Sequence, residues 1–105
     1  MPVQIAFGMT LFPAKAAEYR KRHDDVFPEL AKALKDAGVS DYSIWLDLDS
    51  YHLFGVSTRA DDHSLDKLPD TEIVKRWWVH MADIMATDAD NVPVQIPMKK
   101  VFYLP

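Results

Sequence analysis

Apolar side chains alternate with small or polar ones along residues 3–11, and no other feature constrains the fold of this chain as strongly. A period of two places alternate side chains on one face of a strand, so this strand is expected to bury one face and expose the other. Pro13 comes soon after it and suits the first turn of a helix. We therefore predict a strand that leads into a helix. The apolar positions are Val3, Ile5, Phe7, Met9 and Leu11.

The helix that follows is predicted to run to about Ala37, where Gly38 provides a C-terminal stop. Pro28 lies inside this helix, where it removes a backbone hydrogen bond and crowds the preceding turn. We therefore expect a kink or a break after Phe27. The break would separate a first segment, which carries His23, from a second segment.

A hairpin is predicted after this helix. Val39–Leu48 and Tyr51–Arg59 are rich in aromatic and branched residues, and a short turn at Asp49 and Ser50 separates them. Runs of this composition on both sides of a short turn are typical of paired strands. The polar residues 60–68 that follow predict a loop or a short helical turn.

Pro69 is predicted to open a second helix, because proline is favoured at the first helical position and Asp70 and Glu72 suit the positive end of a helix dipole. The apolar residues of this segment fall at helical spacing, which predicts that one face packs on the core. A turn-rich loop, Asp88–Pro97, follows it. The segment Met98–Leu104 is predicted as the last strand.

The predicted order of elements is strand, helix, strand, strand, helix, strand, which defines an α+β, ferredoxin-like split βαβ fold. A chain of 105 residues has room for one core, so residues 1–105 are expected to form a single domain. Two helices cover only one face of a four-stranded antiparallel sheet. The other face is either polar or covered, and a second copy of the chain is the simplest cover. We therefore predict a homodimer.

The composition excludes several classes of protein. Charged residues make up 27% of the chain and hydrophobic residues 49%, which is typical of a globular protein and not of a disordered one. A net charge of -4 argues against a nucleic-acid partner, since such binding needs a basic surface. The basic cluster Arg20, Lys21 and Arg22 has acidic neighbours, and we interpret it as a solvated helix face.

Cysteine is absent, which excludes disulfides and thiolate metal sites and fits a reducing cytoplasm. No apolar run approaches the roughly 20 residues that a membrane helix needs, so no membrane partner is expected. No two of the four histidines have the spacing of a metal site on one element.

His23 is the candidate for acid–base chemistry. On a helix Tyr19 and His23 are neighbours, and their face continues through Phe27, so the histidine is expected to face inward. Its ordinary pKa, about 6.5, allows proton transfer near neutral pH. Two interpretations are open at this point: a buried histidine with a satisfied hydrogen bond, or a general acid or base beside a tyrosine in a pocket. The other three histidines are predicted to lie at the surface.

Aromatic residues elsewhere in the chain suit a sugar ligand. Trp77 and Trp78 are adjacent, so they point about 100° apart on a helix, and at most one of them faces the middle of the core. Filling the core is the simplest interpretation of the pair. Indole rings also offer an apolar plate for the C–H face of a sugar and an N–H donor, and Tyr19 and Tyr42 supply hydroxyls. Such a site allows cofactor-free proton transfer, including the interconversion of sugar anomers, but it does not select that reaction.

Five stretches of the chain resemble the L-rhamnose mutarotase family, in order and with matching separations over nearly the full length. They are EYRKRHDDVFPEL, DYSIWLD, KRWWVHMADIM, DADNVPV and the terminal VFYLP. The resemblance implies a ferredoxin-like fold of the dimeric α/β-barrel type. It also implies a cytoplasmic enzyme that uses no cofactor and interconverts the α and β anomers of L-rhamnose.

The same resemblance implies roles for single residues. His23, which matches the histidine of the EYxxRH motif of the family, would be the proton donor. The group that completes the proton transfer is open, and a tyrosine, a bound water or Asp83 could serve. The positions that would bind the sugar are Tyr19, Tyr42, Trp77 and Trp78.

Two positions depart from the family pattern, since Phe27 stands where a tryptophan is usual and Val92 where a serine is usual. Either change could adjust which deoxysugar fits. Three other functions are open. They are a mutarotase for a related sugar such as L-fucose, a cofactor-free dimeric α/β-barrel monooxygenase, for which fold analogy is the only support, and a sugar-binding module without catalysis.

Overall fold

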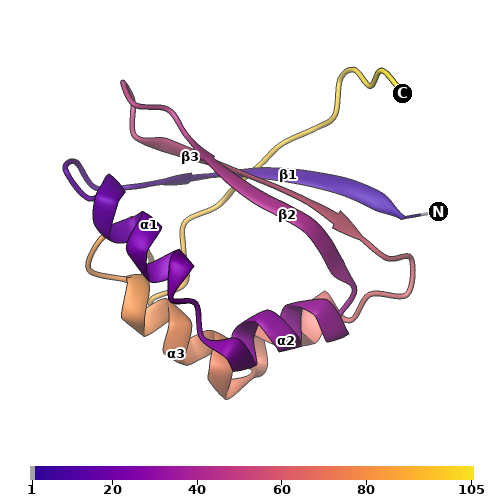
Figure 1. The fold of residues 1–105 in the computed structure, drawn as a ribbon, viewed down its shortest axis with the longest axis horizontal. Coiled ribbons are helices and arrows are strands. Elements are labelled where there is room, and N and C mark those ends of the chain that lie inside the picture. The colour runs from indigo at the N-terminus through magenta and orange to yellow at the C-terminus, as the bar shows by residue number, and fades with distance from the viewer. Residues whose placement is uncertain (1) are drawn as a thin grey trace.

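The computed structural model describes residues 2–105, and its elements follow the predicted order (Figure 1). A strand leads into two short helices, which are followed by a hairpin, a 3₁₀ helix, a third helix and a two-residue strand. The 3₁₀ helix, Leu65–Asp70, begins where a loop or short helical turn was expected. The other elements are β1 (Val3–Thr10), α1 (Ala16–Asp24), α2 (Pro28–Asp36), β2 (Val39–Leu46), β3 (His52–Arg59), α3 (Glu72–Met81) and β4 (Ile96–Pro97).

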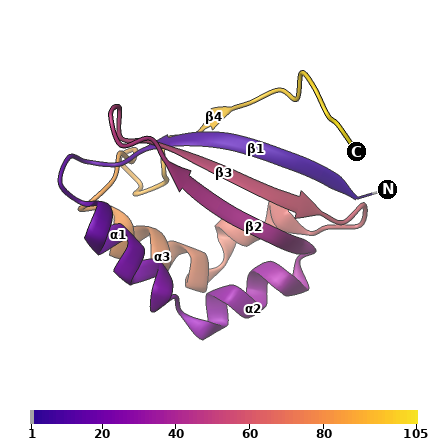
Figure 2. The ribbon, with the colours of Figure 1, turned by 45° about the horizontal axis from the view of Figure 1, so that its top comes forward.

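The strands form one sheet in the order β2-β3-β1-β4. Every neighbouring pair is antiparallel, and the consecutive strands β2 and β3 form the predicted hairpin. This arrangement confirms the α+β, ferredoxin-like fold. Figure 2 shows the helices together on one face of the sheet, and among residues 2–105 no helix lies on the opposite face.

Pro28 breaks the first helical region, as predicted. α1 ends at Asp24, and α2 begins with Pro28 at its first position. Phe27 has the extended backbone angles φ -56° and ψ 123°, which are typical of a residue before proline. The two helices therefore run in different directions across the sheet (Figure 1), and His23 lies on the first of them.

α3 begins at Glu72 and not at Pro69, which lies inside the 3₁₀ helix. Thr71 separates the two helices, because its backbone is extended at φ -85° and ψ 148°. Its N–H and its hydroxyl both donate to the backbone oxygen of Leu68, at 2.9 and 2.6 Å. The predicted start was therefore too early, since the chain closes a tighter turn around Pro69 before it enters α3.

The last strand is shorter and earlier than predicted. Only Ile96–Pro97 pairs with β1, and one further bond joins the N–H of Met98 to the backbone oxygen of Ala6 at 3.3 Å. Residues 99–105 are exposed and form no helix or strand. The prediction of a strand over Met98–Leu104 was wrong, because this tail leaves the sheet (Figure 2) and finds no neighbouring strand among the described residues.

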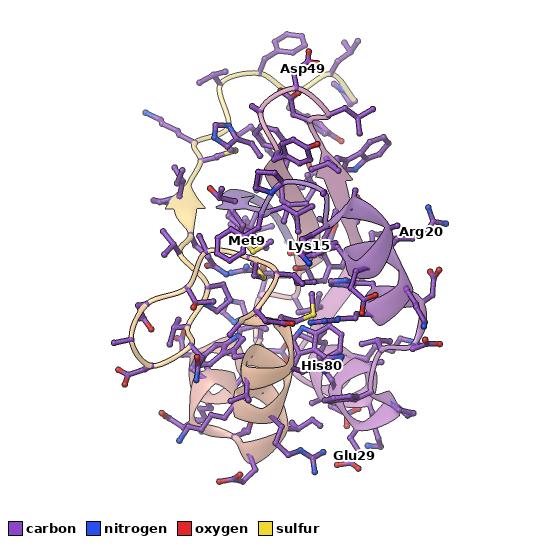
Figure 3. All side chains as sticks on the ribbon, turned by 90° about the vertical axis from the view of Figure 1, so that its left-hand side faces the viewer. Met9, Lys15, Arg20, Glu29, Asp49 and His80 are labelled. Carbon is purple, nitrogen blue, oxygen red and sulfur yellow. The ribbon has the colours of Figure 1, made fainter. Side chains whose placement is uncertain are left out.

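The core lies between the sheet and the helices, and Met9 of β1 is buried in it (Figure 3). Gly55 of β3 lets the ring of Phe7 lie directly against its backbone, since a Cβ atom at Gly55 would lie 2.5 Å from Cζ of Phe7. The ring of Phe7 in turn reaches Tyr42 of β2, with ring centroids 6.2 Å apart. The missing side chain at Gly55 therefore allows β1 to support Tyr42. The largest fully buried side chains are Leu11, Leu53, Met81 and Ile84.

Replacing Gly55 by alanine is expected to destabilise the protein by about 1–3 kcal/mol, because the added methyl group would overlap the ring of Phe7. Urea denaturation, which gives the free energy of unfolding, checks this change. In a Phe7→Leu background the ring is gone, so the same replacement should cost less. Equal costs in the two backgrounds would show that the ring is not the obstacle.

Candidate active site

α1 brings the imidazole of His23 against the ring of Tyr19, one turn earlier. The ring centroids lie 4.3 Å apart at an interplanar angle of 33°. Nδ1 of His23 donates a hydrogen bond to the backbone oxygen of Tyr19 at 3.0 Å, because a carbonyl oxygen can only accept. In the neutral imidazole the other nitrogen, Nε2, then carries no proton and can accept one. The backbone of α1 therefore selects the tautomer.

Trp77 of α3 meets the imidazole from a second direction, edge to face, with ring centroids 5.3 Å apart and an interplanar angle of 85°. Phe27 lies edge to face against the same indole at 5.1 Å and 86°. His80, one turn further along α3 (Figure 3), is exposed, but its ring lies 5.4 Å from Phe27 and 5.5 Å from Trp77. These five residues, Tyr19, His23, Phe27, Trp77 and His80, form what we call the His23 cluster.

Tyr42 reaches the same interior from β2. The pairing of β2 with β3 shifts register around Asp41, whose φ is positive at 47°. Such a bulge re-aims the side chains beside it. The ring of Tyr42 contacts Phe7 on the helix-covered face, and Tyr42 is close enough to Tyr19 to contribute to raising the pKa of that phenol.

Burial sets the protonation states of this interior. Desolvation lowers the pKa of His23, against the opposing effects of the hydrogen bond to Tyr19 and of the Asp24 carboxylate. Burial raises the pKa of Tyr19 far above its ordinary range and that of Tyr42 to about 12. Tyr42 is 41% exposed as a residue, but burial is still the main cause of its raised pKa. At neutral pH the interior therefore combines one unprotonated imidazole with two hydroxyl donors.

Trp78 lies apart from the His23 cluster. It lines a surface cavity of about 790 Å³ with other residues of α3 and of the following loop, among them Lys75 and Asn91. The lining includes no member of the His23 cluster. The two indoles thus diverge, as their adjacent positions on a helix require. Of the predicted site residues, Tyr19 and Trp77 contact His23, Tyr42 lies beside Tyr19, and Trp78 faces the separate cavity.

Two arginines near the site were missed by sequence reasoning. Arg22 was interpreted as part of a solvated helix face, but its side chain is only 14% exposed and lies 2.7 Å from Asp83. Nothing local signals this contact, because the two residues are 61 positions apart. Arg59 of β3 has a buried Nε for which the described residues provide no hydrogen-bond partner, and its charge opposes the raised pKa of Tyr42. The inward register of Arg59 on β3 was the signal that could have found it.

Within residues 2–105 no three His, Asp or Glu side chains gather as a metal site would need. No helix of this part of the chain is long and apolar enough to span a membrane.

The fold and the His23 cluster define a class of small ferredoxin-like α+β proteins that hold a histidine among aromatic rings between the sheet and the helices. The family model for L-rhamnose mutarotase matches residues 4–104. The chain therefore belongs to the L-rhamnose mutarotase family.

Named relatives agree with this membership. The chain is 59% identical over 99 residues to the L-rhamnose mutarotase of Rhizobium meliloti (strain 1021), which covers 94% of this chain and 95% of that protein. It is 55% identical over 102 residues to the L-rhamnose mutarotase of Acidiphilium cryptum (strain JF-5), with 97% and 98% covered. The crystal structure of an L-rhamnose mutarotase from Formosa agariphila matches with a TM-score of 0.91 at 44% identity, over 98% of this chain and 99% of that one. A Pseudomonas aeruginosa protein, with a TM-score of 0.60 and 17% identity, shares the fold alone.

The lowered pKa of His23 predicts that the protein loses stability as the pH falls below 6.5. Between the folded-state pKa and the ordinary value of 6.5, the unfolded chain binds the proton and the folded chain does not. The free energy of unfolding therefore rises with pH across this interval and is level above it. Urea denaturation between about pH 5 and pH 8 measures this change. As the pH is lowered, the free energy of unfolding should fall less in His23→Gln than in the wild type. Equal losses would contradict a lowered pKa.

Proposed function

We propose that this protein interconverts the α and β anomers of L-rhamnose without a cofactor, with His23 as the proton donor. Membership of a family whose named relatives are L-rhamnose mutarotases supports the substrate and the reaction. One observation carries the role of His23: its imidazole lies against two aromatic rings with Nδ1 already engaged, so that Nε2 is the nitrogen left to exchange a proton. The cytoplasmic location stays a prediction from the sequence. The proposed sugar-binding residues are Tyr19, Tyr42, Trp77 and Trp78.

Anomer exchange requires a proton to leave the anomeric hydroxyl and another to reach the ring oxygen, so that the ring opens to an aldehyde. In the proposed mechanism Nε2 of the neutral His23 accepts the proton of the anomeric hydroxyl during opening. The aldehyde group then rotates. When the ring closes on the other face, His23 returns the proton to the carbonyl oxygen and is the donor. Opening breaks the bond between the anomeric carbon and the ring oxygen, and closing re-forms it as the proton given to the ring oxygen goes back to its donor, so that no electron is gained or lost.

A second group has to protonate the ring oxygen as the ring opens. The hydroxyls of Tyr19 and Tyr42 are protonated at neutral pH and can supply this proton, because burial raises the pKa of both, although the same shift makes each a weaker acid. Asp83 suits it poorly, since the hydrogen bond from Arg22 lowers the pKa of its carboxyl group. We therefore propose that a tyrosine hydroxyl, directly or through one water, protonates the ring oxygen.

The two tryptophans have unequal support as sugar-binding residues. Trp77 lies against His23 and offers an indole face and an N–H donor next to the proposed proton acceptor. Trp78 lines the neighbouring cavity instead, so its proposed contact with the sugar rests on the family resemblance. Arg59 is a further candidate donor that sequence reasoning did not include, because its Nε is buried without a hydrogen-bond partner among the described residues and its charge acts on Tyr42.

We also propose that the protein is a homodimer. On the face of the sheet opposite the helices, paired positions form a row across the strands: Trp45, Phe54, Gly8 and Ile96. Trp45 is 66% exposed and Ile96 is 53% exposed. Monomeric proteins rarely leave contiguous apolar surface of this kind in water, and a second copy would cover it. The exposed apolar tail, residues 98–105, would extend the same contact.

Saturation-transfer NMR of L-rhamnose measures anomer exchange directly. The wild type is expected to accelerate it, and His23→Ala is expected to lose about 10²- to 10⁴-fold of the acceleration, the usual contribution of a positioned acid–base group. His52→Ala removes an exposed histidine of β3 and should keep the wild-type rate. A parallel series with L-fucose separates the two sugars.

An absence of acceleration by the wild type would reject the mutarotase activity, and an undiminished rate in His23→Ala would reject the role of His23. The pH dependence adds a further check. The wild-type kcat/KM should fall as the pH is lowered through the pKa of His23, because protonation removes the acceptor at Nε2. A rise instead would mean that the imidazolium opens the ring.

Light scattering at micromolar concentration tests the homodimer. The wild type should have twice the mass of the 12.0 kDa chain. Trp45→Glu places a charge in the apolar row and should shift the protein to the mass of one chain, because a buried unpaired carboxylate is costly. Lys35→Glu changes an exposed side chain of α2, on the helix-covered side of the sheet, and should leave the dimer intact. A wild-type mass equal to one chain would contradict the proposal.

A further inference from the structure

We infer that Arg22 is a positioning residue: it ties the last turn of α1 to the C-terminal end of α3 and thereby sets how the ring of His23 meets the ring of Trp77. The inference rests on the proposed function, because it assigns Arg22 to the same acid–base site. It concerns a side chain that the proposed proton transfer does not use.

The guanidinium of Arg22 is held by partners from both helices. Nη1 donates to the backbone oxygen of His80 at 2.6 Å and to Oδ1 of Asp83 at 2.7 Å, and Nη2 donates to Oδ2 of Asp83 at 3.3 Å. Nε donates to Oε1 of Glu18, one turn earlier in α1, at 2.9 Å. Each nitrogen of the planar fork has an acceptor, which is the geometry that a guanidinium provides and an ammonium does not.

Arg22 also completes the end of α3. This helix ends at Met81, and the N–H of Ile84 donates to the backbone oxygen of Met81 at 3.1 Å and so does not reach His80. The carbonyl of His80 is thus one of the free carbonyls at the negative end of the helix, where a cation is favourable. The cation comes from α1, so the two helix ends are held together by the bond that caps α3.

The contacts of Arg22 lie next to the ring of His23 and the ring of Trp77. Arg22 directly precedes His23, and His80 lies one turn beyond Trp77 and touches its indole. The chain that leads into α1 is held separately, by a hydrogen bond from the N–H of Phe12 to the backbone oxygen of Ile84 at 2.9 Å. Among the described residues, no side chain of α1 other than Arg22 hydrogen-bonds to α3 or to Asp83. The end of α1 that carries His23 therefore depends on Arg22 for its polar attachment to α3.

Arg22, Glu18 and Asp83 all stay charged at neutral pH. The hydrogen bond from Arg22 is the main cause that lowers the pKa of both Glu18 and Asp83, so both carboxylates stay ionised around the guanidinium. The structure shows no contact between the guanidinium and the ring of His23. Arg22 therefore acts on His23 through the placement of the helix and not as a neighbouring charge.

The test compares Arg22→Gln and Arg22→Lys with the wild type in the anomer-exchange assay. Arg22→Gln loses the charge and the fork, and its kcat is expected to fall about 10- to 100-fold, the usual scale for a displaced catalytic group, with KM nearly unchanged. Arg22→Lys keeps the charge and should recover part of kcat. Arg20→Gln is the matched control on the same helix: Arg20 pairs with Asp24 at 3.5 Å, is 83% exposed and projects into solvent (Figure 3), so kcat should be unchanged.

A second readout needs no substrate. The edge-to-face contact with Trp77 shifts the NMR signals of the His23 ring protons by the ring current of the indole, so these signals should move toward unfolded-peptide values in Arg22→Gln and stay in place in Arg20→Gln. If Arg22→Gln does not fold, Arg22→Lys and Asp83→Asn carry the same comparison with smaller expected changes.

Unchanged kcat together with unchanged His23 signals in folded Arg22 variants would overturn the inference. A change confined to KM would also overturn it, since it would mean that Arg22 contacts the sugar. A wild type that does not accelerate exchange would reject the proposed function, while the NMR comparison would still decide whether Arg22 places His23.

Discussion

The helical layer depends on the backbone constraint that Pro28 imposes. Because the residue before a proline avoids helical angles, α1 has to end soon after His23, and α2 sets out in a new direction. The same constraint extends the backbone at Phe27 and lays its ring on the indole of Trp77 at 5.1 Å. The chain therefore builds its ring cluster at a helix break, and Phe27, one of the two departures from the family pattern, lies inside that cluster.

Burial shifts the pKa values of two kinds of titratable group in this interior in opposite directions. Burial disfavours any charged form, so it lowers the pKa of the imidazole of His23 and raises the pKa of the phenols of Tyr19 and Tyr42. All three groups are then neutral at neutral pH, which suits a neutral sugar that exchanges protons without leaving a net charge behind. The charges of Arg22 and Asp83 lie outside the ring cluster and are paired with each other.

Features that depend on local pattern were predictable from the sequence, and features that depend on distant partners were not. The alternation over residues 3–11 predicted β1, and Pro28 predicted the break between α1 and α2. The adjacency of Trp77 and Trp78 predicted that the rings diverge, but only the packing of α1 on α3 decides which of them meets His23. Arg22 has acidic neighbours in its own stretch, so it resembled an exposed side chain, although Asp83, two residues beyond the end of α3, binds it.

The wrong prediction of a strand over Met98–Leu104 has a physical reason that also bears on the site. Strand propensity describes a fit to a neighbouring surface, and within a single chain this segment leaves the sheet without meeting one. The tail, whose residues favour strands but find no partner, lies on the same side of the sheet as the uncovered apolar row. This is the side opposite the helices. The loop that lines the Trp78 cavity leads directly into β4 and this tail. A second copy that held the tail would therefore act on the Trp78 side of α3, whereas Arg22 acts on the His23 side, so the two faces of α3 would be positioned by independent contacts.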